Sequence, residues 1–247
     1  MKAAVITFTS CFGCSFEFLN LEKDLIKVFE KVDFVDFKLI KGENFEERYD
    51  VAFVEGGITR KEEVKKVKKV REKSKIVVAL GACACNGCVL TIKNYRKDSE
   101  KEVYGKNLFG SIRVSPIDEY IKVDYYLRGC PFFKHELISL IKSLSIGKLW
   151  REKTYNVCVE CRKRGNDCLL EKKVLCLGPL SRAGCKAICP TNEYPCVGCR
   201  GFAEDKNLEE FFNIVKKWAS KKELKEKLEM YNLYEEVKGS EAWKKLK

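Results

Sequence analysis

Short apolar runs alternate with amphipathic stretches over the first part of the chain. Runs rich in Val, Ile, Phe and Ala predict buried strands, and they fall at residues 3–8, 32–40, 50–54, 75–80 and 123–127. Apolar residues at helical spacing predict amphipathic helices between them, at about residues 16–32, 64–70 and 135–144. The stretch from Leu90 to Ile121 shows no clear period, so we expect irregular structure there.

Strands that alternate with helices indicate an α/β fold, a doubly wound parallel sheet of the flavodoxin type over residues 1–150. Ligands of such sheets bind at the carboxyl ends of the strands. Three of the expected strands run directly into cysteines, which are Cys11 and Cys14, Cys83, and Cys130. Glycines beside each motif permit tight turns close to a bound group. Four thiolates at one edge of the sheet therefore predict a metal site.

A second group of cysteines crowds into residues 151–203, with the pattern C-x2-C-x6-C-x7-C-x8-C-x3-C-x6-C-x2-C. The residues between them are small, turn-forming or charged, so this segment has little apolar material for a core of its own. We expect a small domain of low secondary structure whose fold depends on metal ligation, by zinc or by iron-sulfur clusters. Its eight cysteines are Cys158, Cys161, Cys168, Cys176, Cys185, Cys189, Cys196 and Cys199.

The composition changes after the last cysteine, and residues 204–247 predict a helical C-terminal tail. Asn207 is placed to cap a helix with an apolar stripe from Leu208 to Trp218, and a Lys-rich helical stretch follows from Lys221. We expect this tail to pack on the rest of the chain or to dock a partner subunit.

The composition indicates a reduced compartment and weakens a nucleic-acid interpretation. The sequence has 14 cysteines among 247 residues, and neither its start nor any later stretch has the apolar run of a signal peptide or a membrane span. We therefore expect a cytoplasmic chain with metal-binding thiols and no direct membrane insertion. The formal charge is +12, but Lys and Arg alternate with Glu, and three clusters of about −2 each would reduce it to roughly +6. We expect no nucleic-acid partner.

Two cysteines and one carboxylate stay outside these groups. Cys85 and Cys88 follow the same strand as Cys83, and either of them could replace Cys83 as a ligand or act as a redox thiol, although buried unreactive thiols are the simpler interpretation. Glu17 lies one turn beyond Cys14, where it would cap a helix, face solvent or relay a proton. The four sheet-edge cysteines also have a simpler alternative, as ordinary core or incidental residues.

The motifs at the three strand ends resemble those of the small subunits of nickel-iron hydrogenases, over about residues 1–203. That family carries C-x-G-C, G-x-C and G-C-P after successive strands, matched here by Cys11-Phe12-Gly13-Cys14, Gly81-Ala82-Cys83 and Gly129-Cys130-Pro131. The hinge Cys176-Leu177-Gly178-Pro179 is also similar. The likeness is strongest to the cytoplasmic archaeal sulfhydrogenase delta subunits and their NAD(P)-linked and methanogen relatives.

The resemblance implies three 4Fe-4S clusters and assigns the ligands. Cys11, Cys14, Cys83 and Cys130 would hold the proximal cluster, the one nearest the nickel-iron site of a large subunit. Cys158, Cys161, Cys168 and Cys176 would hold the distal cluster, and Cys185, Cys189, Cys196 and Cys199 the medial one. Many periplasmic relatives have histidine and proline where this chain has Cys158 and Cys189, which argues here for two complete cubanes.

The implied function is electron transfer between the nickel-iron large subunit and a flavin or iron-sulfur subunit that reduces the acceptor. The chain alone should not act on hydrogen, because its twelve matched cysteines are committed to clusters. We expect the sheet edge to face the large subunit, and Phe12→Glu or Phe132→Glu to break that contact. Two alternatives stay open: a zinc-structured nucleic-acid-binding module, and the electron-transfer subunit of another redox complex.

Overall fold

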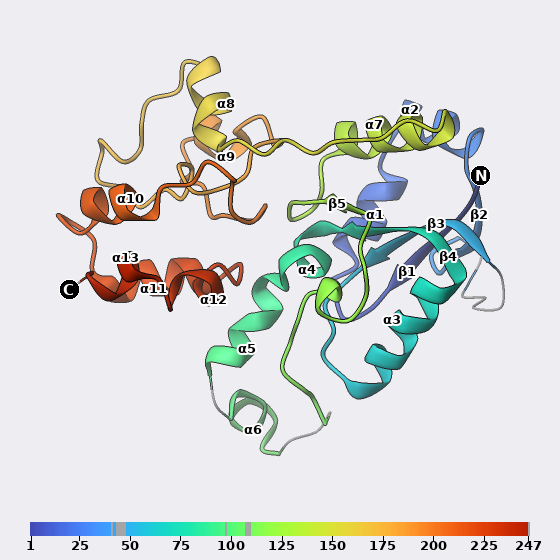
Figure 1. The fold of residues 1–247 in the computed structure, drawn as a ribbon, viewed down its shortest axis with the longest axis horizontal. Coiled ribbons are helices and arrows are strands. Elements are labelled where there is room, and N and C mark those ends of the chain that lie inside the picture. Colours follow the sequence, from blue (N-terminus) through green and yellow to red (C-terminus); the bar gives the residue numbers. More distant parts are fainter. Residues whose placement is uncertain (41, 43–47, 97, 107–109, 247) are drawn as a thin grey trace. The chain divides into compact units, whose positions relative to one another are not determined.

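The computed structural model describes residues 1–40, 42, 48–96, 98–106 and 110–246. They form two compact units, Met1–Arg151 and Glu152–Lys247 (Figure 1). The sheet belongs to the first unit, whereas the cysteine-rich segment and the C-terminal helices both belong to the second. None of the helices in these described ranges is long and apolar enough to cross a membrane.

Five parallel strands make up the sheet of the first unit, in the order β2-β1-β3-β4-β5. This is the flavodoxin order, so the expected doubly wound α/β fold is confirmed. The strands are β1 (Lys2–Thr7), β2 (Asp33–Phe37), β3 (Tyr49–Glu55), β4 (Ser74–Leu80) and β5 (Tyr125–Leu127).

Alternate residues of each strand point to opposite faces, and helices cover both faces (Figure 1). The first face packs against α1 (Gly13–Leu19), α2 (Lys23–Phe29) and α7 (Lys134–Ser145). Phe18 lies at its centre and meets Phe34, Phe53 and Phe132 edge to face, with ring centroids 5.6, 5.2 and 6.0 Å away. The second face packs against α3 (Lys61–Lys73), α4 (Gly81–Asn86) and the 3-10 helix η2 (Ile117–Glu119).

Two expected elements of the first unit were wrong in extent. The helix expected over residues 16–32 is two helices, because Glu22 has a φ of 55°, which a right-handed helix cannot accommodate. The strand expected over residues 32–40 ends at Phe37, where the Ile40 N–H donates to the Phe37 carbonyl and closes a turn. The unpatterned stretch after Leu90 lies partly outside the described residues. Its described parts include η1 (Cys88–Thr91), α5 (Ile92–Tyr95) and α6 (Ser99–Tyr104).

The second unit has little regular structure around its cysteines and a helical remainder. Its cysteine-rich part contains α8 (Val157–Lys163) and α9 (Ile188–Thr191), and the tail contains α10 (Leu208–Val215), α11 (Lys221–Glu229), α12 (Tyr234–Val237) and α13 (Glu241–Lys244). The Asn207 side chain accepts a hydrogen bond from the Glu210 N–H, so the expected cap is confirmed. Leu177 of the hinge and Leu180, directly after it, share one core with the tail residues Phe211 and Phe212.

Candidate metal centres

The first candidate centre lies at the carboxyl edge of the sheet, in the segments that follow β1, β4 and β5. Cys11 and Cys14 follow β1, Cys83 lies on α4 directly after β4, and Cys130 follows β5. Cys14 is buried, while Cys11 and Cys130 are exposed. Burial raises the pKa of the Cys14 thiol, and the neighbouring charges of Glu55 and Cys130 raise it further. The fold therefore brings residues from separate strands to one place.

A buried carboxylate, Glu55, positions the loop that carries Cys11 and Cys14. Glu55 is the last residue of β3, and its two carboxylate oxygens accept hydrogen bonds from the backbone N–H groups of Cys14, at 3.1 Å, and Ser15, at 2.9 Å. The Ser15 hydroxyl donates to the same carboxylate. These bonds satisfy the first turn of α1. This role was missed from the sequence, although Glu55-Gly56-Gly57 directly after a buried strand was a visible signal.

Gly81 lets the loop after β4 approach Cys14. It has a φ of +79°, and a Cβ atom at this position would collide with Cys14 Sγ. The next residue, Ala82, donates its N–H to the Gly129 carbonyl at 2.7 Å, which ties the Cys83 loop to the Cys130 loop. Local backbone geometry thus holds three of the cysteine-bearing loops together.

The two remaining cysteines of this unit, Cys85 and Cys88, lie in different environments. Cys85 is a buried thiol that donates to the carbonyl oxygens of Ala79, at 3.5 Å, and Leu127, at 3.8 Å. Cys88 is fully buried and shares hydrogen bonds with both Cys130 and Cys83. The bond with Cys130 lowers the pKa of Cys88, but the bond with Cys83 and burial outweigh it and raise the pKa to about 12. Of the two cysteines that the sequence offered as replacements for Cys83, Cys88 is therefore the one that lies against two expected ligands.

The structure also shows the surroundings of Phe132 and Glu17, two residues that the sequence analysis considered. Phe132 is 2% exposed and packs in the core against Phe18, so it is not a surface residue and the expectation that Phe132→Glu tests a subunit contact was wrong. Phe16 on α1 is 59% exposed and suits that test better. Glu17 lies 3.8 Å from Lys134 Nζ in an ion pair.

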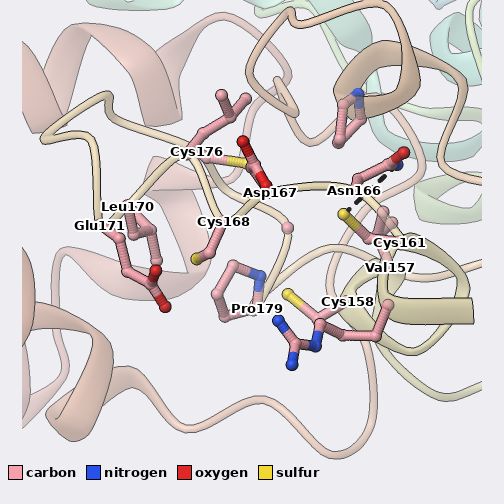
Figure 2. Close-up of a pocket in the computed structure, with 14 residues that line it drawn as sticks. Val157, Cys158, Cys161, Asn166, Asp167, Cys168, Leu170, Glu171, Cys176 and Pro179 are labelled. Atoms are coloured by element: carbon pink, nitrogen blue, oxygen red, sulfur yellow. Dashed lines mark hydrogen bonds between the residues drawn. The ribbon is translucent and has the colours of Figure 1, made fainter. Parts of the chain in front are cut away.

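A second candidate centre is a cavity of about 290 Å³ in the second unit. Figure 2 shows four cysteine sulfur atoms on different sides of it, from Cys158, Cys161, Cys168 and Cys176. Burial raises the pKa of the Cys158 thiol to about 12, and the charges of Cys176, Cys161 and Cys168 add to the rise. Four thiols that influence one another around a shared cavity are the donor set that an iron-sulfur cluster requires.

Hydrogen-bond donors and a glycine next to the sulfur atoms show that this cavity fits a thiolate-bound cluster. Asn166 Nδ2 donates to Cys161 Sγ at 3.7 Å, and the Cys196 N–H donates to Cys176 Sγ at 3.2 Å. Such bonds stabilise the negative charge of ligating sulfur. A Cβ on Gly178 would stand 3.3 Å from Cys158 Sγ and 3.5 Å from Cys176 Sγ, so the hinge glycine gives the sulfur atoms room.

The last four cysteines follow the cavity in sequence, and one of them adjoins it. Cys196 is buried, and burial raises the pKa of its thiol. The charges of Cys176 and Cys199 nearby raise that pKa further. Leu177 N–H donates to the Cys196 carbonyl at 2.9 Å, so the hinge pairs with the segment that carries Cys196. Cys185 precedes α9 and Cys189 lies on it. That these four form one set stays a prediction.

The described residues contain no group of three or more His, Cys, Asp or Glu side chains in the arrangement that holds a single metal ion.

Comparison with known proteins supports the same class of molecule. The family model described as "NADH ubiquinone oxidoreductase, 20 Kd subunit" matches residues 11–144. The Sulfhydrogenase 2 subunit delta of Pyrococcus furiosus is 31% identical over 94% of this chain and 99% of its own length. A vhu subunit of the F420-non-reducing hydrogenase of Methanocaldococcus jannaschii is 33% identical over 85% of this chain and 84% of its own length.

A solved structure agrees with these relatives. A chain of an NAD+-reducing [NiFe]-hydrogenase in the H2-reduced state superposes with a TM-score of 0.54 and 28% identity, over 60% of this chain and 93% of that chain. The fold, the thiol-lined sites and these similarities together define an oxidoreductase subunit of the nickel-iron hydrogenase type with an electron-transfer role. The chain belongs to the NADH ubiquinone oxidoreductase 20 kDa subunit family.

Proposed function

We propose that this chain carries electrons between the nickel-iron site of a large subunit and an acceptor-reducing partner in the cytoplasm. The observation that supports this most strongly is the cavity of the second unit, which is lined by four cysteines and equipped with donors to their sulfur atoms. The relatives and the solved structure named above are hydrogenase subunits, and the one from Pyrococcus furiosus matches the chain over 94% of its length.

The chain would hold three 4Fe-4S clusters, each in one set of four cysteines. The sheet-edge set of Cys11, Cys14, Cys83 and Cys130 would hold the proximal cluster, Cys158 to Cys176 the distal one, and Cys185 to Cys199 the medial one. Such clusters, when bound, supply one-electron carriers whose potentials depend on ligation, hydrogen bonds to sulfur and burial. The residues of the chain would hold the sulfur atoms in place, donate hydrogen bonds to them and exclude water from the clusters.

The exposed sheet edge supports its assignment as the face toward the large subunit. Cys11 and Cys130 are exposed there, and Phe16 presents a 59% exposed apolar side chain on α1. A flavin or iron-sulfur subunit would accept the electrons beyond the distal cluster. The similar proteins differ in their acceptors, because one belongs to an NAD+-reducing hydrogenase and another to an F420-non-reducing hydrogenase. The class of partner is therefore proposed without a particular acceptor.

An electron-transfer subunit of another redox complex is supported less well. The matched family model ends at residue 144, before the eight-cysteine segment begins. The sulfhydrogenase and hydrogenase relatives extend well beyond that point, since they cover 94% and 85% of the chain. The second unit thus favours the hydrogenase assembly.

Cys161→Ala tests the proposed route of the electrons in the assembled complex. Isotope exchange between deuterium gas and the protons of water at a nickel-iron site requires no electrons to leave that site. Reduction of an acceptor does require electrons to leave it. We expect the variant complex to keep isotope exchange and to lose most acceptor reduction, while the control Cys85→Ala keeps both. Wild-type acceptor reduction by Cys161→Ala, or joint loss of both activities, would contradict the proposal.

A further inference from the structure

The turn that ends α8 brings an asparagine back beside a cysteine of that helix. Gly165 has a φ of +70°, the left-handed conformation that commonly closes a helix. The Gly165 N–H donates to the Arg162 carbonyl at 3.0 Å, and the Asn166 N–H donates to the Cys161 carbonyl at 3.4 Å. These two bonds are the pair that defines a Schellman motif, and they hold Asn166 next to the turn that carries Cys161.

The side chain of Asn166 has hydrogen-bond partners on two different segments. Its Nδ2 atom donates to Cys161 Sγ at 3.7 Å, as Figure 2 shows. The same atom donates to Thr191 Oγ1 at 3.0 Å. Thr191 is the last residue of α9, the helix that also carries Cys189. The Asn166 amide therefore connects the wall of the cavity to α9.

The contacts of Thr191 determine which end of the amide faces the sulfur atom. A threonine hydroxyl has a single proton to donate, and Thr191 Oγ1 donates it to the Ala187 carbonyl at 2.9 Å. Towards Asn166, Oγ1 can therefore only accept, which requires the NH2 group of the amide on this side. The second N–H of that group is then available to Cys161 Sγ.

The sulfur end of this contact lies in apolar surroundings. Asn166 and Cys161 both line the cavity, and Cys161 packs against a core that includes the buried residues Val157, Leu169 and Ala187. A hydrogen bond is electrostatically stronger in such surroundings than in water, because the local dielectric constant is low. An N–H that donates to a ligating sulfur stabilises the negative charge that a cluster gains on reduction.

We propose that Asn166 is a positioning residue for the cluster in the cavity of the second unit: its amide, oriented by Thr191, donates to Cys161 Sγ and raises the reduction potential of that cluster. The inference rests on the proposed function, in which this cavity holds the distal cluster. A higher potential at the distal cluster favours the movement of electrons away from the nickel-iron site.

The test compares Asn166→Ala, Asn166→Asp and Thr191→Val in the anaerobically purified full chain. Iron, acid-labile sulfide and zinc are measured first, and the clusters are then titrated by electron paramagnetic resonance. We expect Asn166→Ala to keep its iron and to lower the midpoint potential of one cluster. Asn166→Asp should lower it further, because a negative carboxylate replaces the donor. Thr191→Val should lower the same midpoint by less, because the amide stays but loses its anchor.

Asn192→Ala is the matched control. The Asn192 side chain adjoins α9 as well, but its Nδ2 atom donates to the Ile188 carbonyl at 2.8 Å. We expect this variant to have the midpoint potentials of wild type.

Each outcome supports or overturns the inference. Unchanged or higher midpoints in an iron-replete Asn166→Ala chain would overturn it. If both Asn166 variants lose one cluster, Thr191→Val decides: a lower midpoint of that cluster supports the inference, whereas an unchanged midpoint or loss of the cluster overturns it. A shift in Asn166→Ala without one in Thr191→Val would overturn the orienting role of Thr191. A wild-type chain that holds zinc without sulfide would instead be a failure of the proposed function, visible before any titration.

Discussion

Gly81 allows the segment that carries Cys83 to lie close to the side chain of Cys14. Its φ of +79° strains any residue with a side chain, and a Cβ atom would occupy the space of Cys14 Sγ. The side chain cannot move away easily, because Cys14 is held through its N–H by buried Glu55. The sheet-edge site thus depends on a residue that binds nothing itself.

Gly81→Ala should therefore remove the proximal cluster and leave the outer two in place. We expect a loss of about four iron atoms per chain, the content of one cubane. Gly239→Ala is the matched control, because no atom lies within 4 Å of a Cβ built there. Full iron content in Gly81→Ala would show that the sheet-edge site does not require glycine at this position, which would contradict the role assigned to Gly81.

Glu160 gives the second unit a pH-dependent contribution to its stability. Burial raises the pKa of its carboxyl, but hydrogen bonds from Lys153 and Gly184 outweigh burial and hold the pKa below its usual value. A carboxyl with a lowered pKa in the folded state stabilises the fold above its unfolded pKa, and this stabilisation is lost as the pH falls through the folded pKa.

Glu160→Gln should lower the free energy of unfolding of the second unit by about 1 to 3 kcal/mol near neutral pH. The difference from wild type should shrink as the pH falls below about 4, since both proteins then have an uncharged side chain. Anaerobic urea unfolding followed by the fluorescence of Trp218 and Trp243 measures it. Glu241→Gln, in an exposed ion pair with Lys244, should have little effect. A difference that is independent of pH would contradict the assigned role.

At the scale of elements, the tail helices and the hinge between the cysteine sets form one structure. Leu177 of the hinge and Leu180, directly after it, belong to a single apolar core with Phe211, Phe212 and residues of α11. Leu233, between α11 and α12, lies where a Cβ of Gly198 would stand, beside the turn that carries Cys199. The tail therefore supports the chain segments that present the outer cysteines.

Phe211→Ala should destabilise the second unit by about 3 to 5 kcal/mol, the usual cost of removing a buried aromatic ring. Phe211 is 2% exposed, whereas Ile214 on the same helix is 38% exposed, so Ile214→Ala is the control. We expect the variant to lose iron from the outer clusters faster than wild type on mild heating, while the proximal cluster persists. Equal rates of iron loss for the two variants would argue against support by the tail.

At the scale of the whole molecule, local pattern was enough to predict the α/β order and the strand-end cysteines. Periodicity reports burial directly, and parallel strands bring their carboxyl ends together whatever the loops contain. The role of Glu55 was not found, because it depends on hydrogen bonds between segments that are distant in the sequence. The break between α1 and α2 was also missed. The apolar residues keep their helical spacing across Glu22, but the positive φ of Glu22 interrupts the helix.

The central claim is that the thiols of this chain hold iron-sulfur clusters. Iron, acid-labile sulfide and zinc per chain, measured on anaerobically purified protein, test it most directly. We predict roughly twelve iron and twelve sulfide, with no zinc. About eight iron would contradict the site at the sheet edge. Zinc without sulfide would contradict the electron-transfer function altogether.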